Sequence, residues 1–258
     1  MSRGEIAALV ARLEGHQGTE LHGDGARDLE RLLTLARLAE AADVAGTASS
    51  CGPLRALYGR YVSRLETAEA RALLARGTGV AGLALGEGGD FAGRSYARVR
   101  DLFDHVDFTA CRTFVMVGCG PLPVTLLHVA RRARVPRLVG LEVEPESARD
   151  ARALCRELGV DTVDVQECDG GEFDYSEADV IYIANLVRAK RAVLTRVART
   201  ARAGARVVVR EPSSVGELFA ERGVDVGDSW WRVLARGPED PQFLSYHLFL
   251  ELPAPLSR

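Results

Sequence analysis

Phe114-Val-Met-Val-Gly118-Cys-Gly120-Pro121-Leu-Pro123-Val-Thr125 is the stretch that decides the fold of this chain. Its apolar run, 114–117, predicts a buried strand. The Gly-x-Gly that follows predicts a tight turn close to a ligand, with a helix directly after it. Pro121-Leu-Pro123 stands where a dinucleotide-binding loop has its third glycine. Because each proline lacks an N–H, the turn offers few donors to a pyrophosphate, which favours a nucleoside ligand without phosphates.

Strand and helix patterns alternate from residue 114 onward, which predicts an α/β fold with a mainly parallel sheet and helices on both faces. Further strands are expected at 138–143, 162–166, 179–183, 206–210, 230–235 and 244–250, and helices at 123–134, 147–158, 188–201 and 215–222. The last two strands are suited to an antiparallel hairpin at the sheet edge. In a parallel sheet the ligand lies outside the carboxyl ends of the strands, so residues just after each strand are the candidates for function.

The N-terminal part has a different pattern. Residues 1–76 carry apolar residues at helical spacing, with breaks at 15–25 and 45–53, and this stripe is read as core. The glycine-rich segment 77–93 is either a linker or a lid over the ligand. The expected organisation is therefore a helical N-terminal domain over 1–105 and a Rossmann-like ligand-binding domain over 106–258.

The composition is that of a globular protein, with 47% of the 258 residues apolar and a net charge of −3. This charge indicates no general affinity for nucleic acid or membranes, and no run of about 20 apolar residues predicts a membrane span. The five cysteines form no CxxC pair, which favours a reducing cytoplasm over a disulfide or zinc framework, and no metal is expected. The N-terminus does not resemble a signal peptide. We expect a cytoplasmic protein with a small-molecule substrate, and a homodimer is left open.

Polar side chains follow each expected strand. Glu142 lies about 20 positions after the glycines, where a carboxylate binds ribose hydroxyls, with a surface charge as the alternative. Asp169 is suited to an adenine amino group or to a turn before two glycines. Tyr182 and Asn185 follow the fourth strand, where a reacting group would point into the cleft; the alternatives are a buried tyrosine and a helix cap. Ser213 fits an N-cap or a ligand contact.

Three segments resemble the nicotianamine synthases and their bacterial opine-metallophore relatives. Gly118–Thr125 is similar to their Gly-x-Gly-Pro-Leu-Pro-Leu-Thr, Glu142–Pro145 to their Asp-x-Asp-Pro, and Asp179–Val187 to their Asp-Val-Val-Phe-Leu-Ala-Ala-Leu-Val. The resemblance covers about residues 114–210, and upstream only 65–69 and 90–103 are similar. It implies a Rossmann-like class I methyltransferase fold that uses S-adenosylmethionine as a substrate. The γ-carbon of the methionine moiety is attacked and methylthioadenosine is released, without methyl transfer.

The strand ends and the resemblance together give the candidate site. The nucleoside-binding candidates belong to the glycine turn and the strand ends around it: Gly118, Cys119, Gly120, Pro121, Leu122, Glu142, Val143, Cys168, Asp169 and Ala184. The catalytic candidates are Tyr182, Asn185 and Tyr96, of which the first two would hold the amine or carboxylate of the substrate. Because aromatic faces stabilise a sulfonium, Tyr96, Tyr175, Trp230 and Trp231 are candidate wall residues, with plain packing as the alternative for the tryptophans.

Two departures from the family pattern bear on the reaction. The glutamate expected as general base is absent from Asp90–Phe103, where only Asp101 is nearby, and Asn185 replaces the second alanine of Ala-Ala-Leu-Val. A smaller branch with this core, the azetidine-2-carboxylate synthases of natural-product pathways, needs no acceptor. In that branch the substrate's own amine attacks its γ-carbon and closes a four-membered ring. Loss of an acceptor-binding apparatus suits that reaction, so cyclisation is the expected activity.

Other activities remain open at this point. An enzyme of the same family would transfer the aminocarboxypropyl group to an external amine such as histidine. A methyltransferase shares the fold, and a catalytically silent relative would only bind the nucleoside. An NAD dehydrogenase ranks last because the turn has few N–H groups that could donate hydrogen bonds to a phosphate.

Overall fold

The computed structural model describes residues 3–16, 23–47, 51–76, 99–225 and 230–252. The segment 77–93 and the catalytic candidate Tyr96 lie outside these residues. Within them, no helix is both long and apolar enough to cross a bilayer. The same residues contain no group of His, Cys, Asp and Glu side chains that could hold a metal ion. All five cysteines are free thiols.

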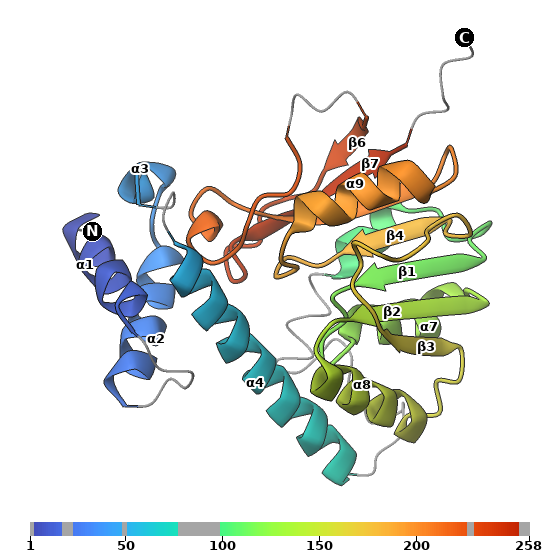
Figure 1. Cartoon of the computed structure of the whole chain (residues 1–258), viewed down its shortest axis with the longest axis horizontal. Coiled ribbons are helices and arrows are strands. Elements are labelled where there is room, and N and C mark those ends of the chain that lie inside the picture. The colour runs from blue at the N-terminus through green and yellow to red at the C-terminus, as the bar shows by residue number, and fades with distance from the viewer. Residues whose placement is uncertain (1–2, 17–22, 48–50, 77–98, 226–229, 253–258) are drawn as a thin grey trace.

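A seven-stranded sheet forms the centre of the fold (Figure 1). Its order is β3-β2-β1-β4-β5-β7-β6; β1 to β5 are parallel, and β7 is antiparallel to both β5 and β6. The strands are β1 (Thr113–Val117), β2 (Arg137–Glu142), β3 (Val163–Glu167), β4 (Val180–Ile183), β5 (Arg206–Pro212), β6 (Arg232–Arg236) and β7 (Ser245–Glu251). The expected edge hairpin is present, and each strand lies close to its predicted position.

Helices cover both faces of this sheet. α7 (Val124–Ala133) and α8 (Pro145–Glu157) pack on one face, and α9 (Lys190–Thr200) packs on the other. Each helix presents an apolar stripe at helical spacing to the sheet, as an amphipathic helix must to bury one face. In α7 this stripe includes Leu126 and Val129, both fully buried. The alternation predicted from the sequence is therefore confirmed.

The helix expected at 215–222 is only a 3₁₀ turn, Gly216–Leu218. The chain there is held by tertiary contacts, because a Cβ on Gly216 would stand 2.0 Å from the carbonyl oxygen of Leu244. The hydroxyl of Ser213 accepts a hydrogen bond from the N–H of Gly216 at 3.1 Å. Ser213 therefore holds the first residue of this turn, although the N-cap position itself is occupied by Val215.

The N-terminal helices are α1 (Arg3–Glu14), α2 (Asp24–Ala36), α3 (Ala41–Val44) and α4 (Gly52–Arg76). They enclose a second apolar cluster, whose buried members include Leu13, Leu29 and Leu54. This cluster continues into Leu218 and Phe219 of the sheet-bearing half. The long α4 lies between the small helices and the sheet (Figure 1).

Lys190, the only lysine of the chain, is buried at the start of α9. Its ammonium donates hydrogen bonds to the carbonyl oxygens of Arg210 and Glu221, both at 2.9 Å, and lies 3.9 Å from the carboxylate of Glu211. Glu211 in turn accepts the N–H of Gly223 at 3.0 Å. Burial lowers the pKa of Lys190 to about 8, and the nearby Glu211 opposes this shift. These contacts join α9 to β5 and to the segment after the 3₁₀ turn.

The pKa of Lys190 predicts a pH-dependent contribution to stability. Between pH of about 8 and the ordinary lysine value of 10.5, the unfolded chain holds a proton that the folded chain has released. The free energy of unfolding of the wild type, relative to Lys190→Met, should therefore rise by about 2 kcal/mol between about pH 7.5 and about pH 10. Urea unfolding of both proteins at the two pH values measures this difference. The cysteines also titrate in this range, but both proteins contain them, so their contribution to the free energy of unfolding cancels. A constant difference would mean that Lys190 keeps its ordinary pKa.

Candidate active site

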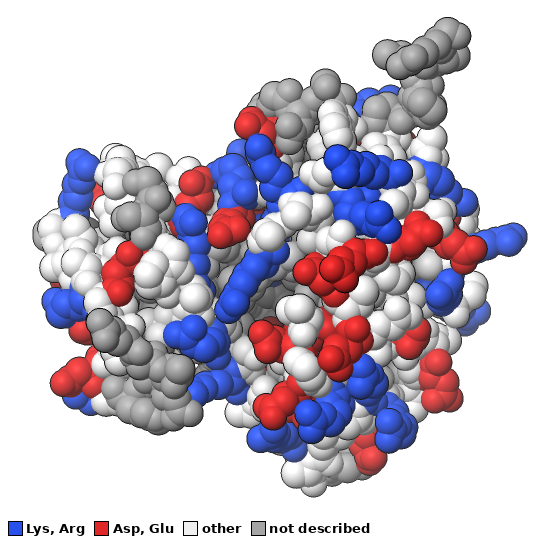
Figure 2. Space-filling model, in the orientation of Figure 1, with Lys and Arg blue, Asp and Glu red and all other residues white. Residues whose placement is uncertain are grey.

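A cavity of about 690 Å³ lies along the carboxyl ends of β1, β2, β3 and β4, and α4 forms its opposite wall. Figure 2 shows the hollow between the N-terminal helices and the sheet, bordered by basic side chains on one side and acidic ones on the other. The strand order reverses between β1 and β4, at its floor. Open α/β sheets bind ligands at such a reversal, and the volume is in the range of small-molecule pockets.

The nucleoside-binding and catalytic candidates that the structure describes all line this cavity. The turn contributes Gly118, Cys119, Gly120, Pro121 and Leu122, and the strand ends contribute Glu142, Val143, Cys168, Asp169, Tyr182, Ala184 and Asn185. The convergence follows from the parallel sheet, because successive strands end at the same edge.

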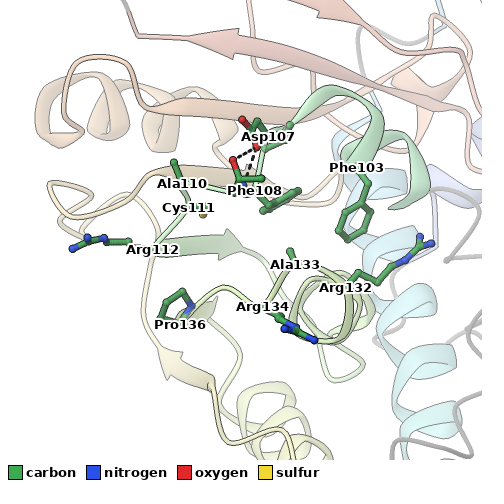
Figure 3. Close-up of a pocket in the computed structure, with 12 residues that line it drawn as sticks. Phe103, Asp107, Phe108, Ala110, Cys111, Arg112, Arg132, Ala133, Arg134 and Pro136 are labelled. Atoms are coloured by element: carbon green, nitrogen blue, oxygen red, sulfur yellow. Dashed lines mark hydrogen bonds between the residues drawn. The ribbon is translucent and has the colours of Figure 1, made fainter.

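A second hollow, of about 800 Å³, lies at the opposite edge (Figure 3). It is lined by the segment before β1, including Asp107, Phe108 and Arg112, and by the end of α7, including Arg132 and Arg134. Asp107 accepts two hydrogen bonds from the neighbouring threonine, from its N–H and its hydroxyl. This hollow lies at the amino ends of the strands, away from the edge where α/β sheets bind ligands. The candidate active site is therefore the cavity under α4.

The backbone N–H groups of the glycine turn are used within the protein. Gly118 and Cys119 both donate to the carbonyl oxygen of Leu141, at 2.9 and 3.1 Å, and Gly120 donates to Oε2 of Glu142 at 2.8 Å. Gly118 and Gly120 have φ angles of 72° and 67°, in the left-handed region that favours glycine. The two prolines that follow contribute no N–H. This turn is therefore poorly equipped to bind a pyrophosphate, as its sequence predicted.

Glu142 is buried under this turn, with 8% of its surface exposed, which rules out the surface-charge alternative. Its Oε2 accepts the N–H of Gly120 and its Oε1 accepts the N–H of Glu144 at 3.0 Å. Each carboxylate oxygen can accept a further hydrogen bond, so the group can hold the turn and bind two ligand hydroxyls together. Glu66 of α4 approaches the same turn, since a Cβ on Gly120 would lie 2.6 Å from its Oε2. Burial first, and then Glu142 and Glu66, raise the pKa of the Cys119 thiol.

The end of β3 forms a turn. Oδ1 of Asp169 accepts the N–H of Gly171 at 2.7 Å, so the turn role of Asp169 is present, and its contact with an adenine amino group stays a prediction. Tyr175 donates its hydroxyl to the carbonyl oxygen of Gly170 at 2.8 Å and is fully buried beneath this turn. It does not line the cavity, so its role as a wall residue is wrong.

The two tryptophans do not line the cavity either. Trp230 is half-exposed, and Trp231 packs against the cluster on the α9 side of the sheet. The aromatic wall comes instead from Tyr58 and Tyr61 of α4 and from Phe243 before β7. Burial raises the pKa of the Tyr61 hydroxyl, with a further contribution from a nearby glutamate.

The sequence predicts that the apolar stripe of α4 is core, and this prediction is only partly right. Leu54 and Leu57 are core, but Tyr58, Tyr61 and Leu65 line the cavity. The signal in the sequence was the pair of tyrosines on an otherwise leucine-rich stripe, because a tyrosine hydroxyl needs a polar partner that a core seldom offers. The N-terminal helices therefore supply one whole wall of the site.

Asn185 presents an unsatisfied acceptor in the cavity wall. Its Oδ1 is buried and has no hydrogen-bond partner among the described residues. The residue that caps α9 is Ala189, and no side chain bonds there, so the helix-cap alternative is wrong. A buried acceptor without a donor costs roughly 1–3 kcal/mol. A ligand N–H at this position would remove that cost.

A group of arginines lies at the β5 end of the cavity. Arg210 is buried; it donates a hydrogen bond to the hydroxyl of Ser245 at 2.6 Å and lies 5.1 Å from the ring centre of Phe243. Arg37, the C-cap residue of α2, and Arg188, after β4, line the same cavity. Carboxylates surround the glycine turn, and guanidinium groups lie at the other end. The cavity therefore fits a ligand with hydroxyls at one end and a carboxylate at the other.

No protein-family model matches the chain. Over 160 residues, 61% of this chain, it is 29% identical to an L-histidine 2-aminobutanoyltransferase of Pseudomonas aeruginosa. A second strain of the same species has a relative of that name at 28% identity. The chain spans about 60% of the length of these curated relatives.

Solved structures of MtNAS, a nicotianamine synthase, superpose on the whole chain. One mutant, in complex with S-adenosylmethionine, gives a TM-score of 0.72 at 19% identity over 97% of this chain and 98% of that one. MtNAS in complex with MTA and tNA gives a TM-score of 0.75 at 20% identity, over 96% and 97%. At these identities the likeness shows the fold, which is the predicted Rossmann-like methyltransferase fold with its N-terminal helices.

Proposed function

We propose that this protein consumes S-adenosylmethionine by attack on the γ-carbon of the methionine moiety and releases methylthioadenosine. The nucleoside would lie over the glycine turn, with its ribose hydroxyls on Glu142. The amino-acid arm would extend toward Asn185 and the guanidinium of Arg210. Two observations support this placement. The glycine turn has few free N–H groups to bind a phosphate, and the two ends of the cavity carry opposite charges. The fold, which MtNAS shares while binding S-adenosylmethionine, supports it too.

The specific reaction that we propose is cyclisation to azetidine-2-carboxylate. The substrate's neutral amine attacks its own γ-carbon, a C–N bond forms, and the C–S bond breaks with its electron pair going to sulfur. The sulfonium becomes a neutral thioether, and the new ring nitrogen carries the positive charge. The protein must fold the amino-acid arm of the substrate so that its nitrogen lies opposite the departing sulfur. Such positioning can account for much of the reduction in the activation barrier.

The observation that carries the proposal is the unpartnered Oδ1 of Asn185. An amide oxygen at this place can hold the substrate's amine by accepting one of its N–H groups. A carboxylate would also hold the amine, but it would favour the charged ammonium, which cannot attack. An uncharged acceptor therefore suits an enzyme whose nucleophile is the substrate's own nitrogen.

Transfer to an external amino acid is the second candidate. The aligned relatives are named L-histidine 2-aminobutanoyltransferases. Glu66 places a carboxylate in the cavity that could serve as a base, and a volume of about 690 Å³ leaves room beside a nucleoside. Both reactions release methylthioadenosine and differ only in whether an acceptor is required.

Incubation of the purified protein with S-adenosylmethionine alone separates these possibilities. We expect methylthioadenosine and azetidine-2-carboxylate in equal amounts, detected by mass spectrometry. Parallel reactions contain histidine or another amino acid. If methylthioadenosine formed only when an amino acid was added, the reaction would be transfer to that amino acid and not cyclisation. S-adenosylhomocysteine as the product would contradict attack at the γ-carbon, and no turnover under any condition would contradict the proposed function.

A further inference from the structure

Three hydrogen-bonded side chains form a row that begins at the cavity, and a fourth side chain, nearer the surface, contacts its outer end. Tyr182 of β4 lines the cavity, and its hydroxyl lies 3.0 Å from Nε2 of His247 on β7. Nδ1 of His247 lies 3.1 Å from Oδ2 of Asp101, in the helix at 99–105. Oδ1 of Asp101 lies 3.2 Å from Nδ1 of His105. The row therefore links three elements that are far apart in the sequence.

The proton positions in this row follow from the donors and acceptors. The carboxylate of Asp101 can only accept, so Nδ1 of His247 carries the hydrogen. Nε2 of neutral His247 is then an acceptor, and the hydroxyl of Tyr182 donates to it. Nδ1 of His105 also carries a hydrogen, because both oxygens near it, the carboxylate and the carbonyl of Asp101, are acceptors. Tyr182 can therefore pass its proton to His247, while Asp101 accepts hydrogens from both histidines.

Burial decreases along the row. Tyr182 is 2% exposed, and the side chains of His247, Asp101 and His105 are 5%, 17% and 33% exposed. The inner end is therefore shielded from water, and the outer end reaches it. The imidazole of His247 therefore takes up a proton out of contact with water, beside the carboxylate of Asp101.

Packing fixes the row. The ring of His105 stacks on Phe249 at 4.4 Å between centres, and Phe249 also lies 5.9 Å from His247. Asp101 rests against Gly237, where a Cβ would come within 2.1 Å of its Oδ2. The charged groups that face His247 are Asp101 and Arg210, its cross-strand partner on β5. The carboxylate therefore orients the imidazole and stabilises its protonated form, as in a Ser-His-Asp triad.

We propose that Tyr182, His247 and Asp101 form a proton path that takes one proton from the substrate's ammonium group to the imidazole of His247. This inference rests on the proposed function. Tyr182 accepts the ammonium proton while its own hydroxyl proton passes to Nε2 of His247. The imidazolium keeps its Nδ1 hydrogen on the carboxylate of Asp101, which stabilises the charge, and it releases the extra proton from Nε2 through the hydroxyl of Tyr182 to water once the product has left the cavity. The amine is left neutral with its lone pair free for attack, and His247 and Asp101 act as positioning residues behind Tyr182.

The test is the pH profile of turnover in variants of the row. An α-amino group ordinarily titrates near pH 8, so a substrate that depends on bulk titration is mostly charged at about pH 7. We expect His247→Asn and Asp101→Asn to lower kcat about tenfold at about pH 7 and less than about twofold at about pH 9. The wild type should be flat over this range. His128→Asn, which alters another buried histidine outside the cavity, should match the wild type at both pH values.

Two further measurements separate the path from a structural role. Calorimetry with methylthioadenosine should give affinities within about threefold of the wild type, which shows that the variants keep a formed site. Nitrogen-15 NMR of the histidines should place the hydrogen of His247 on Nδ1 in the wild type. A loss of turnover that is equal at both pH values, or a hydrogen on Nε2, would overturn the path while leaving γ-carbon attack intact. Absence of methylthioadenosine from wild-type reactions would instead overturn the proposed function.

Discussion

Asn185→Ala should lower kcat about 100-fold or more and change the affinity for methylthioadenosine less than about threefold. The amide oxygen of Asn185 is buried in the cavity wall without a partner, beyond the end of β4. It would hold the attacking nitrogen, whereas the nucleoside is held around the glycine turn. Removing it frees the arm to rotate away from the in-line arrangement without disturbing the ribose contacts. Single-turnover kinetics and calorimetry on one preparation measure the two quantities.

Asn185→Asp is the matched control, because it keeps the size of the side chain and adds a charge. A carboxylate there should favour the ammonium form of the substrate, so binding should tighten while turnover recovers only as pH rises above about 8. Equal losses of kcat and of nucleoside affinity in Asn185→Ala would show that the residue binds the nucleoside. Unchanged turnover in both variants would remove Asn185 from the reaction.

The fold could be predicted because its signals are local. The apolar run before Gly118 and the alternation after it specify strands and helices by periodicity alone. The positive φ angles of Gly118 and Gly120 show why glycine is favoured in that turn. The helix predicted at 215–222 is absent because the structure there depends on contacts with a distant segment. There Gly216 is pressed against the carbonyl of Leu244, a contact from a distant segment that no local pattern contains.

The candidate site was predictable on the sheet side and not on the helical side. Strand ends converge by topology, so Glu142 and Asn185 could be placed in one cavity from their positions after strands. A helical stripe, by contrast, looks the same whether it faces a core or a cavity, so the spacing of Tyr61 predicts a core position although Tyr61 lines the cavity. The hydrogen bonds of His247 could not be predicted from local sequence patterns, because its partners Tyr182 and Asp101 precede it by 65 and 146 residues.

Glu142→Ala should weaken methylthioadenosine binding about 100-fold, the largest loss of affinity that we expect from a single substitution in this site. Two losses combine. The ligand would lose charge-assisted hydrogen bonds from its ribose hydroxyls, each worth about 1.5–3 kcal/mol. The turn would lose the acceptor of the Gly120 and Glu144 N–H groups, so its position under the nucleoside would no longer be fixed. Calorimetry with methylthioadenosine measures this loss without any turnover.

Glu142→Gln divides the two contributions. Its amide oxygen can still accept one N–H, but its amino group repels the other donor, so affinity should fall between those of the wild type and the alanine variant. Glu146→Gln, on the exposed first turn of α8 and outside the cavity, removes the same charge nearby and should leave affinity within about twofold, because surface charges are screened. If Glu142→Ala bound methylthioadenosine as well as Glu146→Gln did, the carboxylate would only shape the turn, and the nucleoside would have to lie elsewhere in the cavity.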